Sequence, residues 1–316
     1  MVSNSETRLG NPYPDFVIIG AAKSGTTTVA EYLARHPAIA FSRAKEPEIL
    51  RWELSEEQAR KSYSKMFSGA NPEQLRGEGS TCYSGWSNWR EDSTESKIVA
   101  PADPSHAVTT MMKEIGETAQ RLARFSPHAR IIYMVRHPVD RIYSQVHYNT
   151  RHAAVPVDFE ASIQSDPRYV HVSHYAEILQ LYLACFPREQ FFICQLDEVV
   201  SDLPGLLNRV QDFLNVPRVP DLITNKVFTN EGKTHNLRRT LSNRLKKIPG
   251  YPLLRNLAPN ALREAAFDLI KRTQSDKAVK VQPMLPETRS HLLKHFDGLN
   301  QEFHKLTGLD ISRWGR

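Results

Sequence analysis

A short segment near the amino terminus gathers a lysine and several hydroxyl groups around two glycines. Lys23 lies inside the loop Gly20–Gly25, just ahead of a stretch with helical spacing. Small residues let a backbone turn sharply and approach a ligand closely, and the start of a helix presents free N–H groups to an anion. The segment therefore predicts an anion site, although a strand-to-helix turn can also use small residues for packing alone. The further donors expected there are Ser24, Gly25, Thr26, Thr27 and Thr28.

The spacing of this loop differs from that of ATP and GTP sites. In the Walker pattern the lysine follows the second glycine and precedes the Ser or Thr that holds magnesium, whereas Lys23 precedes Gly25. A nucleotide triphosphatase also needs a carboxylate at the end of a nearby strand to hold the metal. The apolar run 131–135 ends in Arg136 instead. An arginine at that point indicates direct binding of an anion, without a metal.

Arg136 is also the first residue of a second candidate anion site. Ser144 follows eight residues later, and a helix that starts at Pro138 puts Ser144 about two turns in while Arg136 stays at the helix start. An arginine and a hydroxyl that converge there could hold a dianionic phosphate by charge-assisted hydrogen bonds. The pair alone is weak support, because Arg and Ser often occur at such a spacing by chance.

A basic run late in the chain is a third candidate contact for an anion. Between residues 233 and 263 there are eight Lys and Arg residues and no Asp or Glu. Two interpretations stay open, a solvated helical face and a lid over a polyanionic ligand. No nucleic-acid-binding motif is recognisable, and aromatic residues do not interleave with this run as a base-stacking platform requires. We therefore expect no nucleic-acid partner.

Strands that alternate with helices would position these residues. The apolar runs 16–19, 131–135 and 191–196 predict three strands. Such alternation implies an α/β fold, and we expect a P-loop-like, three-layer arrangement with a mainly parallel central sheet flanked by helices. Apolar periodicity predicts helices over 26–35, 55–67, 107–125, 173–186, 204–214, 237–247 and 287–306.

The composition is that of an ordinary globular protein. Of the 316 residues, 40% are hydrophobic and 24% are charged, which predicts one domain over residues 13–316 behind a flexible amino terminus 1–12. No signal-peptide pattern and no apolar run of about 18 residues occurs, so we expect no membrane partner. Three scattered cysteines, without metal-ligand or disulfide spacing, favour a reduced, cytoplasmic location. They are Cys82, Cys185 and Cys194.

The loop around Lys23, taken together with the segment from Arg136 to Ser144, resembles the two nucleotide-binding segments of sulfotransferases. These enzymes use 3′-phosphoadenosine 5′-phosphosulfate (PAPS). The first segment resembles the family's 5′-phosphosulfate loop and the second its 3′-phosphate site. The resemblance runs from about residue 15 to residue 309 and is closest to the heparan-sulfate type and its bacterial small-molecule relatives. Other similar segments are His36-Pro37, Lys45-Glu46-Pro47, Gly77 to Tyr83, His174-Tyr175, Phe186-Pro187 and Gln190-Phe191.

The resemblance implies catalytic roles for three residues. Lys23 would stabilise the charge that develops on the leaving phosphate, and Glu46 would be the general base that accepts a proton from the acceptor. His174 is the alternative base, because imidazole titrates near neutral pH without tuning. The competing interpretations are that Glu46 is an ordinary loop carboxylate paired with Lys45 or Arg43, and that His174 caps or packs at a helix start.

The resemblance also implies binding residues and a cofactor. Glu78 and Tyr83 would contact the acceptor, and the segment 229–247 would cover the nucleotide, with Lys233 and Arg238 on its phosphates. PAPS would be the co-substrate and adenosine 3′,5′-bisphosphate (PAP) the product, with no metal required and no metal ligands assigned.

The acceptor is expected to be a small molecule sulfated on a hydroxyl or amino group. Animal heparan enzymes have lysine and proline in the strand-end motif, where this chain has Gly79 and Thr81. That departure argues against a carbohydrate polymer. The oligomeric state stays open. The alternative functions are a P-loop kinase for a small molecule or nucleotide, and a polyanion-binding module.

Overall fold

The computed structural model describes residues 11–85, 103–153, 158–220 and 282–315. These residues belong to one compact unit, which comprises residues 1–225 and 281–316 of the chain. The expected covering segment 229–247, with Lys233 and Arg238, lies outside the described residues, and so does the predicted helix 237–247. Their roles, and the prediction of a single domain, stay predictions.

A five-stranded sheet forms the centre of this unit, with the strand order β2-β3-β1-β4-β5. Every pair of neighbouring strands in it is parallel, which confirms the expected fold class. The two strands that apolar runs did not predict are β2 and β3, the first of which has only three residues. The strands are β1 (Phe16–Gly20), β2 (Ile39–Phe41), β3 (Leu75–Gly79), β4 (Arg130–Val135) and β5 (Phe191–Gln195).

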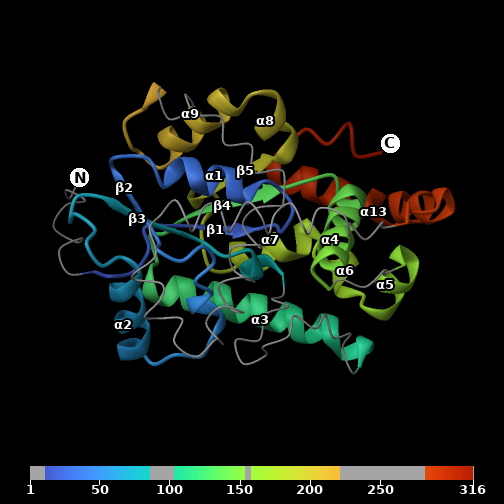
Figure 1. Cartoon of the computed structure of the whole chain (residues 1–316), viewed down its shortest axis with the longest axis horizontal. Coiled ribbons are helices and arrows are strands. Elements are labelled where there is room, and N and C mark those ends of the chain that lie inside the picture. Colours follow the sequence, from blue (N-terminus) through green and yellow to red (C-terminus); the bar gives the residue numbers. More distant parts are fainter. Residues whose placement is uncertain (1–10, 86–102, 154–157, 221–281, 316) are drawn as a thin grey trace, which may run out of the picture. The chain divides into compact units, whose positions relative to one another are not determined.

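Helices cover both faces of the sheet (Figure 1). Side chains of successive strand residues point to opposite faces, so Val17 and Ile19 pack with α2, α3, α7 and α13, whereas Phe16 and Ile18 pack with α1, α8 and α9. None of the described helices is both long and apolar enough to cross a bilayer. The helices are α1 (Thr26–Leu33), α2 (Glu56–Met66), α3 (Pro104–Phe125), α4 (Pro138–Ala153), α5 (Phe159–Ser165), α6 (Arg168–His171), α7 (Tyr175–Leu183), α8 (Leu196–Ser201), α9 (Leu203–Phe213) and α13 (Pro286–Thr307), with the short 3₁₀ turns η1 (Ile49–Arg51), η2 (Thr81–Ser84) and η3 (Arg188–Gln190).

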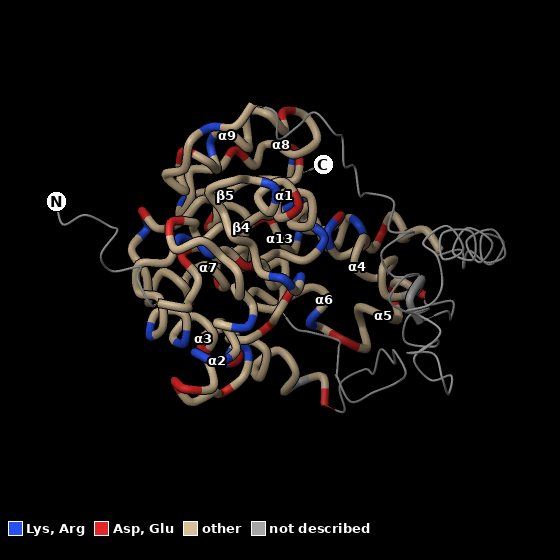
Figure 2. Tube along the Cα trace, turned by 60° about the vertical axis from the view of Figure 1, so that its left-hand side comes forward, with Lys and Arg blue, Asp and Glu red and all other residues tan. Residues whose placement is uncertain are grey.

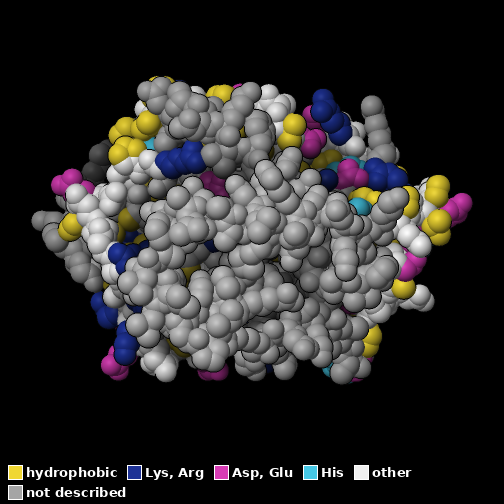
Figure 3. Space-filling view, in the orientation of Figure 1, with side chains coloured by type: hydrophobic (Ala, Val, Ile, Leu, Met, Phe, Trp, Pro, Cys, Tyr) yellow, Lys and Arg dark blue, Asp and Glu magenta, His cyan; other side chains and the backbone are white. Residues whose placement is uncertain are grey.

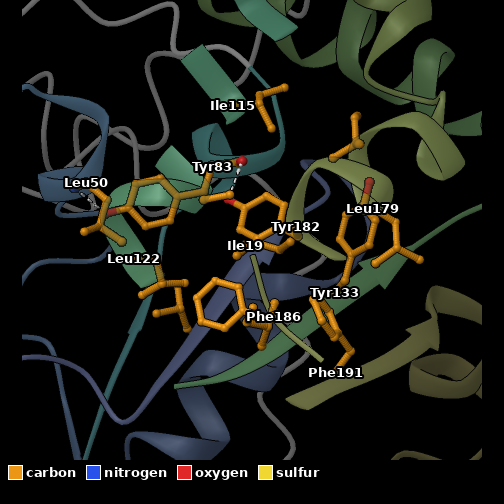
Figure 4. Close-up of a cluster of buried hydrophobic side chains, with 14 of the residues drawn as sticks. Ile19, Leu50, Tyr83, Ile115, Leu122, Tyr133, Leu179, Tyr182, Phe186 and Phe191 are labelled. Atoms are coloured by element: carbon orange, nitrogen blue, oxygen red, sulfur yellow. Dashed lines mark hydrogen bonds between the residues drawn. The ribbon is translucent and has the colours of Figure 1, made fainter. Parts of the chain in front are cut away.

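The buried cluster on the α3 and α7 side fixes the segment that follows β3. Tyr83, in η2, lies among apolar side chains of the sheet and of the helices (Figure 4). The Tyr182 hydroxyl of α7 donates a hydrogen bond to the carbonyl oxygen of Tyr83 at 2.8 Å. A buried tyrosine needs such a partner for its hydroxyl. Packing in this buried cluster and the hydrogen bond from Tyr182 therefore fix the position of η2.

The strand order places two loops next to each other at the carboxyl edge of the sheet. After β1 the chain builds β2 and β3 on one side of β1, and it then returns to build β4 on the other side. In open α/β sheets, ligands bind at such a point of reversal, outside the carboxyl ends of the strands. The loop after β1 carries Lys23 and the loop after β4 carries Arg136, so both predicted anion sites lie at this point.

Candidate active site

The loop between β1 and α1 starts at Gly20, the last residue of β1, which lies close against η2. Its backbone is closed by a hydrogen bond from the Ser24 N–H to the Ala21 carbonyl at 3.2 Å. At Gly20, an added Cβ atom would lie 2.0 Å from the Ser84 hydroxyl oxygen of η2, so only glycine fits there. The loop ends at Gly25, the N-cap of α1. The predicted order of strand, tight loop and helix is present.

Ser24 supplies a buried hydroxyl inside this loop. The residue is fully buried, and among the described residues its Oγ atom has no hydrogen-bond partner. A buried hydroxyl without a partner costs free energy, on the order of 1–3 kcal/mol. An anion bound at the start of α1 would satisfy this oxygen together with the N–H groups of the first helical turn. The loop therefore fits a phosphate or sulfate group.

Lys23 and Arg136 are in direct contact across the two loops. The Arg136 guanidinium donates to the Lys23 carbonyl oxygen at 3.4 Å, and the Lys23 ammonium lies 4.1 Å from the ring centroid of Tyr148 in α4. Ser144 precedes Tyr148 by one helical turn, so both lie on the same face of α4. The structure thus brings together Lys23, Arg136 and the face of α4 that carries Ser144.

Glu46 lies at the carboxyl end of β3. Its N–H donates to the Gly79 carbonyl at 3.1 Å, and its carboxylate accepts a hydrogen bond from the Thr81 hydroxyl at 3.2 Å. Lys45 lies 4.0 Å from the same carboxylate. A Cβ atom added to Gly20 would lie 3.4 Å from the Thr81 carbonyl oxygen, so Thr81 lies between the Glu46 carboxylate and the start of the phosphate loop.

Glu78 and Tyr83 lie inside the protein. Both are fully buried, and the Tyr83 hydroxyl lies 3.2 Å from each carboxylate oxygen of Glu78. The carboxylate also accepts from Tyr63 at 2.7 Å and from Ser80 at 3.3 Å. In this structure both side chains serve the core, and their expected contact with an acceptor stays a prediction.

His174 lies at the start of α7 with both ring nitrogens engaged. Nδ1 is 2.9 Å from a Glu177 carboxylate oxygen, and Nε2 is 3.0 Å from Nε2 of His295 in α13. Burial and the neighbouring His171 lower the pKa of His174 to about 4, so the ring is neutral at pH 7. The structure places the two candidate bases in different surroundings, Glu46 beside the phosphate loop and His174 between α7 and α13.

Comparison with known proteins assigns the chain to a family. The model of the sulfotransferase family matches residues 14–221, which include Lys23, Glu46, Arg136 and His174. The chain belongs to the sulfotransferase family. It is therefore an enzyme that transfers sulfuryl groups.

The sulfotransferase is similar to curated and solved relatives. Human heparan sulfate glucosamine 3-O-sulfotransferase 6 is 26% identical over 318 residues, which cover 96% of this chain and 74% of that protein. Human carbohydrate sulfotransferase 15 is 26% identical over 250 residues, or 64% of this chain and 44% of that protein. The crystal structure of a sulfotransferase from Alicyclobacillus acidocaldarius matches with a TM-score of 0.62 and 21% identity, over 96% of this chain and 99% of that chain. This last likeness supports the fold.

Arg141 is a residue of the sulfotransferase that the sequence analysis missed. The side chain is fully buried in α4. It donates from Nε to the Ser173 hydroxyl at 2.5 Å and from Nη2 to the Tyr169 carbonyl. The Tyr175 hydroxyl then donates to the Arg136 carbonyl at 2.8 Å. These bonds fix the start of α7 against the Arg136 loop. An arginine in an amphipathic helix ordinarily predicts a solvated position, so no sequence signal marked it.

The buried carboxylate of Glu78 should make the stability of the sulfotransferase depend on pH. Burial raises the pKa of Glu78 from 4.5 to about 7, against the lowering effect of the Tyr63, Tyr83 and Ser80 hydroxyls. Between these values the folded state binds more protons than the unfolded state, so stability falls as pH rises from about 4.5 through about 7. The loss is on the order of 3 kcal/mol.

The measurement is the free energy of urea unfolding at several pH values from 5 to 8, for the wild type and for Glu78→Gln. Glutamine keeps the shape and an acceptor oxygen but does not ionise. We expect the stability of the wild type relative to the variant to decrease steadily over this range. Two parallel stability curves would show that Glu78 titrates as an ordinary carboxylate.

Proposed function

We propose that this sulfotransferase moves a sulfuryl group from PAPS to a hydroxyl or amino group of a small molecule. The observation that supports the proposal is the contact of the Arg136 guanidinium with the carbonyl of Lys23, which joins the two predicted anion sites at adjacent strand ends. PAPS has a phosphosulfate at one end of its ribose and a phosphate at the 3′ position. Two separated but linked anion sites are what such a donor needs.

The residues divide between the two ends of the donor. Lys23, the buried Ser24 hydroxyl and the N–H groups at the start of α1 would hold the 5′-phosphosulfate. Arg136 and Ser144 would hold the 3′-phosphate by charge-assisted hydrogen bonds. Lys233 and Arg238 are proposed as further phosphate contacts from outside the described residues.

Lys23 and Glu46 are proposed to act on opposite sides of the transferring sulfur. PAPS supplies the activated sulfuryl group. Glu46 accepts the proton as the acceptor oxygen or nitrogen forms its bond to sulfur. The bond from sulfur to the bridging oxygen breaks, and the phosphate leaves with the electron pair, its charge met by the Lys23 ammonium.

The backbone conformations of these two residues support the assignment. Lys23 has a φ angle of 73° and Glu46 one of 60°, the left-handed region that residues other than glycine rarely adopt. Such conformations cost roughly 1–3 kcal/mol each and cluster at ligand sites. Two of them at the same edge of the sheet are consistent with side chains held for chemistry.

The acceptor assignment has one competitor. The matched relatives are named for heparan sulfate and carbohydrate sulfation, so a carbohydrate hydroxyl is the second candidate. Gly79 and Thr81, at the end of β3 and the start of η2, stand where animal heparan enzymes have lysine and proline, and they favour the small molecule. Sulfate transfer measured over a panel of phenols, amines, monosaccharides and heparan fragments would distinguish the two.

Donor binding can be tested without knowing the acceptor. We expect PAP to raise the melting temperature of the protein far more than ATP with magnesium does, because ligands that bind only the folded state stabilise it by mass action. Equal shifts with the two nucleotides would defeat the donor assignment. They would favour a kinase, and activity that depends on magnesium would then support that alternative.

Arg136→Ala is the matched variant for this experiment. It removes charge-assisted contacts that are worth on the order of 2 kcal/mol, so PAP should bind about 30-fold more weakly. Arg313→Ala, at an exposed position near the carboxyl terminus, is the control and should bind PAP like the wild type.

In the part of the chain that the structure describes, basic and acidic residues are interspersed (Figure 2). This pattern gives no support to a polyanion-binding module there.

A further inference from the structure

Three potential metal ligands meet where α6 ends and α7 begins. His171 is the last residue of α6, His174 is the N-cap of α7, and Glu177 lies in the first turn of α7. One ligand atom from each lies within 4.8 Å of the others. The cluster is separate from the phosphate loop and from Glu46, and the proposed sulfuryl transfer does not need it.

The local fold explains why these three side chains converge. The His174 N–H donates to the His171 carbonyl at 2.9 Å, which turns the chain from α6 into α7. The two imidazole rings stack with their centroids 3.9 Å apart. Glu177 is one helical turn beyond His174 and reaches back to both rings, 2.9 Å from Nδ1 of His174 and 3.1 Å from Nε2 of His171. The three ligands are spaced three residues apart, and the turn between α6 and α7 brings all three side chains together.

The donor set suits a divalent transition-metal ion. Two imidazole nitrogens and one carboxylate oxygen form a common ligand set for zinc, with bonds of about 2.0–2.2 Å. In a tetrahedral site two ligand atoms of one such ion are about 3.4 Å apart, so the cluster, whose ligand atoms lie within 4.8 Å of one another, must close by up to about 1.4 Å. The two stacked rings must also tilt so that both nitrogen lone pairs point at the ion. Glu177 now accepts an N–H group from each ring, through a different carboxylate oxygen for each, and one bound ion would replace these two hydrogen bonds.

We propose that His171, His174 and Glu177 bind one divalent ion of the zinc type, with water completing its coordination. The side chains are 23%, 8% and 37% exposed in that order. The ion would therefore enter from the Glu177 side and be bounded by the buried ring of His174. Over the region of α13, histidine side chains lie beside acidic and basic ones on the molecular surface (Figure 3).

His295 in α13 provides the outer partner that such a site requires. A histidine that binds a metal through one nitrogen ordinarily donates the N–H of its other nitrogen to a neighbour, which fixes the ring and its tautomer. With Nδ1 of His174 on the metal, its Nε2 faces Nε2 of His295 at 3.0 Å. The ion would thereby link α6, α7 and α13. His174 directly precedes Tyr175, whose hydroxyl donates a hydrogen bond to the Arg136 carbonyl.

The experiment is a calorimetric titration of the full-length, chelator-treated protein with zinc, followed by its melting temperature with and without the ion. We expect one zinc ion per chain and a higher melting temperature. Magnesium, which prefers oxygen ligands, should produce neither effect. His171→Ala and Glu177→Gln should each weaken zinc binding at least about 100-fold, and His295→Ala should weaken it about 10- to 100-fold as an outer partner.

His128→Ala, at an exposed position outside the cluster, is the matched control and should bind zinc like the wild type. Glu177→Gln keeps the size of the side chain and provides the test even where His171→Ala destabilises the fold. Zinc binding of wild-type strength in Glu177→Gln would overturn the proposal, as would a wild type that binds no zinc. Because PAP binding is measured separately, either result leaves the donor assignment untouched.

Discussion

Lys23→Ala should lower the turnover number roughly 100- to 1,000-fold, the usual effect of removing a donor aimed at charge that develops in the transition state. In the structure the Lys23 ammonium lies over the Tyr148 ring. A cation–π contact of this kind is worth only about 0.5–2 kcal/mol. A bond to the leaving phosphate is charge-assisted on both sides and is stronger. We therefore expect the ammonium to leave the ring when the donor binds.

The measurement is kcat with saturating donor, together with the dissociation constant for PAP. Tyr148→Phe is the matched control, because phenylalanine keeps a ring face for the resting lysine, and its turnover should stay close to that of the wild type. Lys23→Arg should recover part of the lost rate, since the charge is kept while its geometry changes. A Lys23→Ala variant that loses PAP affinity but keeps its turnover would assign Lys23 to binding alone.

The local structure around Lys23 and Arg136 was predictable because it rests on local signals. The strand, loop and helix around Lys23 are contiguous, and each contributes its own pattern of apolar, small and hydroxyl residues. The same holds for Arg136, which directly follows the buried run of β4. That the two loops touch follows from the strand order. The sequence predicts the fold class but not this order, because hydrophobic periodicity does not say which strands are neighbours in the sheet.

β3 shows why the remaining fold was not predictable. Its sequence, Leu-Arg-Gly-Glu-Gly, has no β-branched or aromatic residue and therefore no strand propensity. It is a strand because β1 and β2 pair with it on both sides. At Gly77 an added Cβ atom would lie 2.0 Å from the ring of Phe16, so the glycine makes room for a core side chain. That reason appears only in three dimensions.

The surroundings of the charged and titratable residues were equally unpredictable from the sequence. Nothing local distinguishes Glu78, which is buried among tyrosine hydroxyls, from Glu46, which is partly exposed beside Thr81. The same is true of His174, whose partner His295 is 121 residues away in the chain. Burial of a polar group and long-range pairing depend on how helices pack, so residue type and spacing could nominate these side chains but could not place them.

Glu46→Gln should lower the turnover number roughly 100-fold or more, because the amide keeps the shape of the side chain but cannot accept the proton. Nucleotide affinity should be unchanged, since Glu46 is not assigned to the phosphates. The Thr81 hydroxyl, which donates to this carboxylate at 3.2 Å, can donate equally to the amide oxygen. The loop around position 46 should therefore keep its conformation, and the rate loss would report the proton transfer itself.

His174→Ala decides between the two candidate bases, because they predict opposite rankings. With Glu46 as base, turnover collapses in Glu46→Gln and largely persists in His174→Ala, with PAP affinity as the check that each variant is folded. The structure favours Glu46 because its carboxylate is linked through Thr81 to the phosphate loop, whereas both nitrogens of His174 face Glu177 and His295. Near-full turnover by Glu46→Gln on the true acceptor would instead make this carboxylate structural.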